Sequence, residues 1–150
     1  LSLKGRALRY LAAREHSRAE LATKLSRHVG PEDDPDAVAR VLDELAAKGF
    51  IDEARVAESV LHRRAGRLGG ARVLQELRAK GLPDDVVADA AAQLRSTELA
   101  RAQAVWRRKF GQPPADAAER ARQLRFLAAR GFSGDVARRA LGGAADDDDF

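Results

Sequence analysis

The sequence contains no cysteine and no methionine, and only 5% of its 150 residues are aromatic. Without cysteine the chain forms no disulfide, performs no thiolate catalysis and binds no zinc through sulfur. It has no apolar run near the roughly 18 residues that a membrane helix needs. Hydrophobic residues make up 45% and charged residues 33%, as in folded domains. We therefore expect a folded protein of a reducing compartment, the cytoplasm, with no contact to a membrane.

Residues that could perform chemistry are few and isolated. The three histidines lack a partner at the spacing of a metal site: His16, His28 and His62. Three serines stand where a hydroxyl caps a helix: Ser17, Ser96 and Ser133. The glycines at 66, 69 and 70 have neither the spacing nor the preceding strand of a phosphate-binding loop, so they predict a helix break. The sequence thus predicts no enzyme, no metal and no cofactor.

Helical periodicity of apolar residues runs along nearly the whole chain, and strand-like alternation is not convincing anywhere. Leu21, Leu25 and Val29 follow one another at intervals of four residues, which places them on one helix face. Ser17 with Glu20 three residues later is the pattern of a capping box at the start of that helix. Glycines then mark several helix ends: Gly49, Gly81 and Gly131. We expect an all-α protein.

The helical pattern repeats. Corresponding helix ends at Val29, Leu82 and Phe132 lie 53 and 50 residues apart. A three-helix unit of this size buries little apolar surface alone, so neighbouring units should share interfaces. The predicted architecture is three tandem three-helix repeats forming an elongated curved rod. The expected segments are residues 3–50, 51–95 and 96–141, followed by a disordered acidic tail at 142–150.

Positive charge is concentrated in the last third of the chain. Residues 101–141 contain ten basic and three acidic side chains, a net charge of +7, against +4 for the whole sequence. Helical spacing places many of the basic residues off the apolar stripes. We interpret them as surfaces for an anionic partner, a nucleic acid or an acidic protein face, with a merely solvated surface as the alternative. The candidate binding residues are Arg63, Arg64, Arg67, Arg72, Lys80, Arg107, Arg108, Lys109, Arg125 and Arg130.

Three segments, taken in order, resemble the RecX family. Residues 104–141 read AVWRRKFGQPPADAAERARQLRFLAARGFSGDVARRAL, residues 58–82 read ESVLHRRAGRLGGARVLQELRAKGL, and residues 6–25 read RALRYLAAREHSRAELATKL. The chain departs from the family pattern at Ala71 and Leu74, where the family often has basic residues, and at Gly134, where it often has an aromatic one. We therefore do not count those three positions among the candidate binding residues.

The resemblance implies a regulator without catalytic activity. Family members bind the RecA filament on single-stranded DNA and inhibit its ATPase, strand-exchange and co-protease activities. We therefore expect the RecA filament as partner, direct contacts to single- and double-stranded DNA in addition, and a monomeric protein. The alternative is a stand-alone helical DNA-binding protein that acts through phosphate contacts.

The predicted architecture can be tested in solution. Circular dichroism should show helix and no substantial strand. Small-angle X-ray scattering should give a radius of gyration well above the roughly 15 Å of a compact 150-residue domain, because an extended array spreads its mass along one axis. A radius near 15 Å would contradict the rod.

Overall fold

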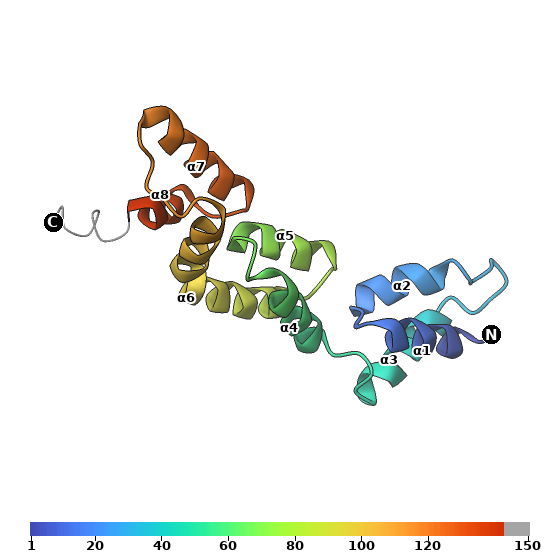
Figure 1. The fold of residues 1–150 in the computed structure, drawn as a ribbon. Coiled ribbons are helices and arrows are strands. Elements are labelled where there is room, and N and C mark those ends of the chain that lie inside the picture. The colour runs from blue at the N-terminus through green and yellow to red at the C-terminus, as the bar shows by residue number, and fades with distance from the viewer. Residues whose placement is uncertain (143–150) are drawn as a thin grey trace. The chain divides into compact units, whose positions relative to one another are not determined.

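The structure, a computed structural model, describes residues 1–142 (Figure 1). Within that range the regular secondary structure consists of helices joined by turns and loops, without strands. The acidic tail that the sequence predicts lies outside the described residues, apart from Gly142. Eight helices follow one another in the described part: α1 (Leu3–Ala13), α2 (Arg18–Ser26), α3 (Ala37–Ala47), α4 (Glu53–Arg64), α5 (Gly70–Ala79), α6 (Asp84–Lys109), α7 (Ala117–Ala129) and α8 (Gly134–Gly142).

Three three-helix repeats would have nine helices, whereas the described residues form eight. The difference arises because α6 is one continuous helix where two were expected. It continues for 26 residues through the expected boundary at 95 and 96, in a segment without glycine or proline. Ser96 does not cap a helix; its hydroxyl donates to the Gln93 carbonyl at 2.7 Å inside α6. The prediction of a helix start there was wrong, because a serine hydroxyl can bond a carbonyl one turn earlier and leave the helix unbroken.

The described chain forms two compact units. The first comprises Leu1–Ser59 and Leu77–Val87; the second comprises Val60–Glu76 and the chain from Ala88 onward. Helices α4, α5 and α6 therefore each contribute residues to both units.

In the first unit, α1, α2 and α3 pack against one another. Their buried faces form one core of Ala7, Leu21, Leu25, Leu42, Leu45 and Ile51. The predicted capping box is present: Ser17 Oγ accepts from the Glu20 amide, and Glu20 Oε1 accepts from the Ser17 amide, both at 3.0 Å. Two free N–H groups at the start of α2 are thus satisfied within the sequence motif itself.

The same capping residues also hold the end of α5 inside the first unit. Ser17 is fully buried, and its hydroxyl donates to the Lys80 carbonyl at 2.5 Å. The other carboxylate oxygen of Glu20 accepts from Arg14 at 2.8 Å and lies 3.6 Å from the Lys80 ammonium. Burial raises the pKa of Glu20, but the Arg14 hydrogen bond, the Ser17 amide and the Lys80 charge outweigh burial and lower the pKa to about 2.

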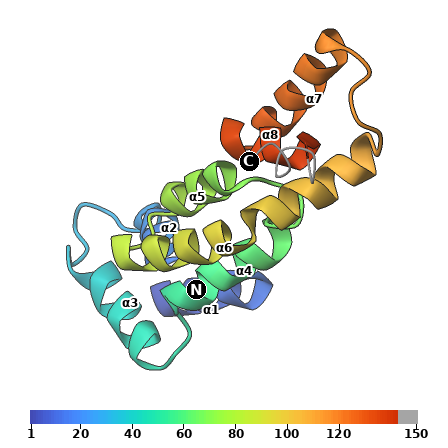
Figure 2. The ribbon, with the colours of Figure 1, turned by 90° about the vertical axis from the view of Figure 1, so that its left-hand side faces the viewer.

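In the second unit, the end of α6 packs with α7 and α8, which lie against each other in both views (Figures 1 and 2). The core contains Ala102, Val105, Leu127, Phe132, Ala137, Ala140 and Leu141. Trp106 is half-buried against this core, and its indole N–H donates to Gln123 Oε1 at 2.8 Å. Trp106 is therefore a packing residue.

Two backbone segments of the second unit meet without side chains between them. The Gly69 amide donates to the Arg130 carbonyl at 2.7 Å. A Cβ added to Gly69 would lie 2.2 Å from the carbonyl carbon of Gly131. Gly131 itself has φ +97°, a conformation that L side chains rarely adopt. The glycines predicted as a helix break thus also allow the start of α5 to touch the turn between α7 and α8.

Substituting Gly69→Ala should destabilise the protein, because the new methyl group meets backbone that cannot move aside. We expect a loss of about 1–3 kcal/mol or more and a melting temperature several degrees lower. Gly66→Ala is the matched control, since nothing lies within 4 Å of its Cβ position. Thermal unfolding of both variants measures the difference, and equal melting temperatures would refute the close contact.

Acid should weaken the first unit partly through Glu20. Its folded pKa of about 2 lies below the ordinary value of 4.5, so its contribution is complete above pH 4.5 and is lost as the pH falls towards 2. Glu20→Gln keeps a capping-box side chain but removes the charge. Urea unfolding should show this variant less stable than the parent at pH 7, and the difference in their free energies of unfolding should disappear between pH 4.5 and 2. A difference that does not change with pH would show that the charge is not responsible.

Candidate functional site

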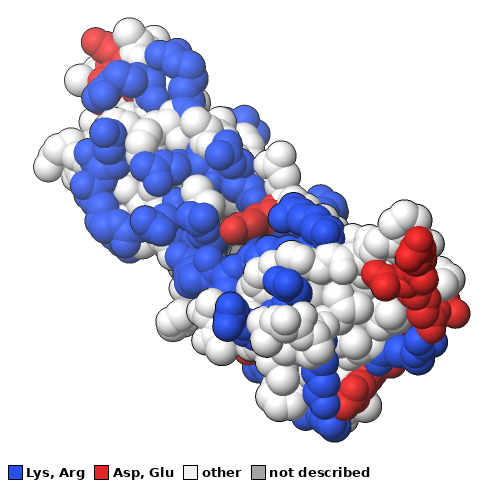
Figure 3. Space-filling model, turned by 90° about the vertical axis from the view of Figure 1, so that its right-hand side faces the viewer, with Lys and Arg blue, Asp and Glu red and all other residues white. Residues whose placement is uncertain are grey.

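The structure separates the ten candidate binding residues between the two units. Lys80 belongs to the first unit, where its side chain is only 16% exposed and lies beside Glu20. The other nine belong to the second unit. Lys and Arg cover much of that unit's surface on the face that Figure 3 shows, with little Asp or Glu among them.

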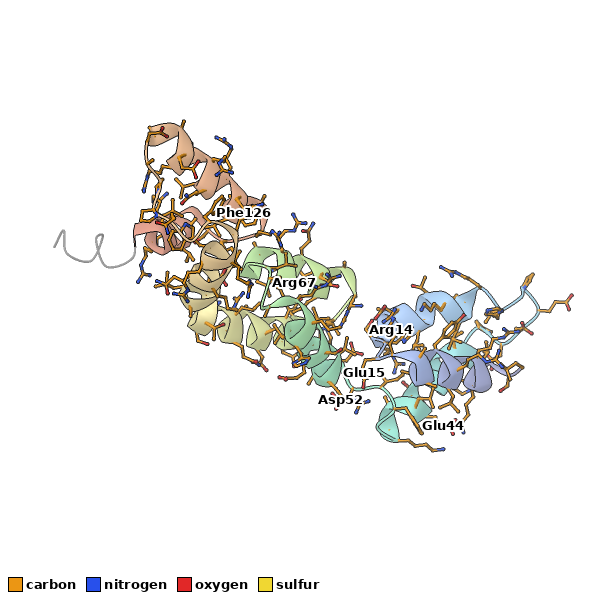
Figure 4. All side chains as sticks on the ribbon, in the orientation of Figure 1. Arg14, Glu15, Glu44, Asp52, Arg67 and Phe126 are labelled. Carbon is orange, nitrogen blue, oxygen red and sulfur yellow. The ribbon has the colours of Figure 1, made fainter. Side chains whose placement is uncertain are left out.

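Four of these nine residues line one hollow, which we call the basic hollow. Its volume is about 260 Å³. Its lining consists of Arg67, Val105, Arg108, Lys109, Phe126 and Arg130. Arg67 and Phe126 reach it from different parts of the second unit (Figure 4). No carboxylate belongs to this lining, so the four cations are not neutralised within the hollow.

Helix ends position the cations of the basic hollow. Arg108 and Lys109 occupy the last turn of α6, and Arg130 is the C-cap residue that directly follows α7. The C-terminus of a helix carries partial negative charge, which favours cations there. Arg108 also donates to the Gly66 carbonyl at 3.0 Å and so ties the end of α6 to the loop that carries Arg67.

Phe126 supplies an aromatic wall to the basic hollow. Lys109 Nζ lies 5.3 Å and Arg130 Cζ lies 4.9 Å from the centre of its ring. The edge contact with Phe110, at 5.4 Å and 85°, fixes the ring further. Cations at such distances are attracted to the face of the ring. Sequence reasoning missed Phe126 as a site residue, although its spacing of four from Arg130 on α7 could have indicated the contact.

The remaining candidates differ in how far they are free to bind a partner. Arg64 Nε lies 3.4 Å from a Glu76 carboxylate oxygen, and Arg72 donates to the Ala129 carbonyl at 3.3 Å. Three others are exposed and form no ion pair with another described residue: Arg63, Arg107 and Arg125.

One basic residue that the sequence did not single out is structural. Arg101 donates to the Ala65, Leu68 and Leu94 carbonyls at 2.9, 2.6 and 3.1 Å. It also pairs with Glu98 one turn earlier, and its side chain is only 12% exposed. The spacing of three residues between Glu98 and Arg101 was the sequence signal that could have indicated this ion pair. Because these bonds close the loop before α5, Arg101 supports the basic hollow without lining it.

The arrangement of cations in the basic hollow can bind an anion. A guanidinium group presents two parallel N–H donors, which fit the two oxygens of a carboxylate or a phosphate. Within residues 1–142, no three His, Cys, Asp or Glu residues come together as metal ligands would. None of the described helices is both long and apolar enough to cross a membrane.

Comparison with known proteins identifies the family. Models of its first, second and third three-helix domains match residues 4–45, 52–90 and 96–141, each described as a domain of RecX. Regulatory protein RecX of Leptothrix cholodnii is 61% identical over 94% of this chain and 88% of its own length. Regulatory protein RecX of Ralstonia nicotianae is 53% identical over 96% of this chain and 89% of its own length.

Solved structures agree at the level of the fold. The crystal structure of RecX from Lactobacillus salivarius superimposes with a TM-score of 0.78 at 19% identity, covering 93% of this chain and 92% of that one. A second crystal structure of a regulatory protein RecX gives a TM-score of 0.73 at 23% identity, covering 92% of this chain and 70% of that one. With the three matching domains and the close relatives, they show that the chain belongs to the RecX family of regulatory proteins.

Proposed function

We propose that this chain binds the RecA filament on single-stranded DNA and inhibits its ATPase, strand-exchange and co-protease activities. It acts by binding rather than by catalysis, as a monomer in the cytoplasm. Family membership supports the regulatory role. The observation that carries the proposal is the basic hollow, where four cations and an aromatic ring face one space that contains no carboxylate.

Inhibition by binding requires a preference between states of the filament. A ligand shifts an equilibrium only by its difference in affinity for the two states. We propose that the basic surface of the second unit fits an acidic surface of the filament in the state with low ATPase activity. Binding then withdraws the filament from its ATPase cycle, and no chemistry by this chain is needed.

The candidate residues contribute unequally to this surface. Arg63, Arg67, Arg107 and Arg125 are exposed without an ion pair in the described chain, so binding costs them no internal contact. Arg108, Lys109 and Arg130 line the basic hollow. The remaining three already have partners within the protein, and we assign them a smaller part: Arg64, Arg72 and Lys80.

The alternative is binding to DNA itself, single- or double-stranded. The same guanidinium groups fit phosphate oxygens, which is the observation that favours it. Such binding would weaken steeply as salt rises, because each phosphate contact releases a counterion. A protein that acts only by coating DNA inhibits RecA only at concentrations that coat it, and excess single strand removes the inhibition.

The direct test is the ATPase activity of RecA on single-stranded DNA, with and without this protein. The double variant Arg67→Glu with Arg125→Glu should raise the half-inhibitory concentration about tenfold or more, equivalent to ~1.4 kcal/mol of binding free energy. Its melting temperature should stay near that of the parent, since exposed substitutions usually change stability by less than about 0.5 kcal/mol.

A matched control makes the same change of charge in the first unit. Arg9→Glu with Arg27→Glu replaces two exposed arginines there and should leave inhibition close to that of the parent. If both double variants lose inhibition equally, net charge rather than this surface is responsible. If the parent fails to inhibit at any concentration, the proposed function is wrong. Complete relief by excess single-stranded DNA would favour the DNA-binding alternative.

A further inference from the structure

A second hollow of the second unit differs in character from the basic one. It has a volume of about 640 Å³, within the range of sites that take a ligand side chain or small molecule. We call it the apolar hollow. Its walls include Ala71 and Leu74 of α5, Ala91 and Leu94 of α6, and Phe132 and Val136 beside the start of α8.

The polar groups in this lining are mostly occupied. The carboxylate of Glu98 accepts from the Gly70 amide, at 2.9 and 3.2 Å, and pairs with Arg101. The hydroxyl of Ser133 accepts from the Val136 amide at 3.2 Å, as a cap of α8. Arg95 is different: it is exposed and forms no ion pair with another described residue. The apolar hollow thus has one free charge on its wall, and that charge is positive.

One further guanidinium group lies close to the lining of the apolar hollow. An Nη of Arg138 would lie 3.1 Å from a Cβ added to Gly134, the residue after Ser133, and Arg138 is exposed. Arg72 also touches the lining, with its Cγ against Gly131, but its guanidinium already donates to the Ala129 carbonyl. Arg95 and Arg138 therefore supply positive charge at the apolar hollow, while Glu98 is neutralised by Arg101.

We infer that the apolar hollow takes a large apolar side chain from an acidic segment of the partner protein. The apolar walls fit the side chain, and Arg95 and Arg138 fit carboxylates beside it. The inference rests on the proposed function, because the segment belongs to the filament that this chain regulates. It adds a second contact of another kind: burial of apolar surface is not screened by salt as exposed charge pairs are.

A nucleic acid fits this hollow less well. Bases bind such surfaces by stacking on the face of an aromatic ring, and the one aromatic residue of the lining, Phe132, is only 3% exposed. A phosphate would use the arginines but gain nothing from the apolar walls. The composition of the hollow therefore favours a protein segment over a DNA strand.

The test places a carboxylate on the wall of the apolar hollow with little risk to the fold. Ala71 is exposed and lies in the first turn of α5, where an acidic side chain is compatible with the helix dipole. The carboxylate of Ala71→Glu should repel the acidic segment and keep water in the hollow, where it would oppose burial of an apolar side chain. We expect binding to RecA filaments on single-stranded DNA, measured by co-sedimentation, to weaken roughly 10- to 100-fold, the worth of one buried apolar side chain.

The control variant is Ala92→Glu, which makes the same substitution at an exposed position of α6 outside the lining. It should bind like the parent, and both variants should keep the parent's melting temperature. Arg95→Gln should weaken filament binding in the same direction as Ala71→Glu, by a smaller factor.

The outcomes separate the two proposals. If the parent binds the filament and Ala71→Glu binds as well as Ala92→Glu, the apolar hollow has no part in docking and only this inference falls. If Ala71→Glu weakens binding to free single-stranded DNA as much as binding to the filament, the occupant is nucleic acid and the inference is overturned. If the parent does not bind the filament, the proposed function and this inference both fall.

Discussion

The second unit depends on the contact between two glycines, Gly69 and Gly131. Where backbone meets backbone, the Gly69 amide can reach the Arg130 carbonyl at 2.7 Å, and the loop before α5 lies against the turn before α8. The basic hollow has Arg67 from one side of this contact and Arg130 from the other. The apolar hollow likewise has Ala71 and Phe132. Both candidate binding surfaces therefore depend on a junction at which neither glycine has a side chain.

Local sequence signals predicted the parts of the fold that local interactions determine. Ser17 with Glu20 indicated a helix start, and both hydrogen bonds of the capping box are formed. Gly131 indicated a helix end, and its positive φ explains why. The helix start expected at Ser96 rested on a serine alone, and it failed because that hydroxyl bonds the Gln93 carbonyl within a segment that has no glycine or proline to interrupt the helix. Ser17 differed in having a second signal, Glu20 three residues later, which completes the capping box.

For the candidate site, the sequence predicted the kind of residue but not its surroundings. Helical spacing placed Arg67 and Lys80 alike off the apolar stripes, yet Lys80 lies beside Glu20 in the first unit and Arg67 lines the basic hollow. Periodicity reports which way a side chain leaves its own helix and contains no information on what another helix brings to it. For the same reason, sequence spacing could pair Phe126 only with Arg130, and its contact with Lys109 became apparent only once the ends of α6 and α7 were seen together.

The continuous helix α6 also restricts how the length of this protein can change. One residue inserted between Leu94 and Ala102 would turn everything after it by about 100° and advance it by about 1.5 Å. Arg101 would lose the Ala65 and Leu68 carbonyls that it binds, and the Gly69 amide would lose the Arg130 carbonyl. The loop at 111–116 faces no such requirement. Insertions and deletions should therefore be tolerated in that loop and excluded from the middle of α6, even where the residues themselves are free to vary.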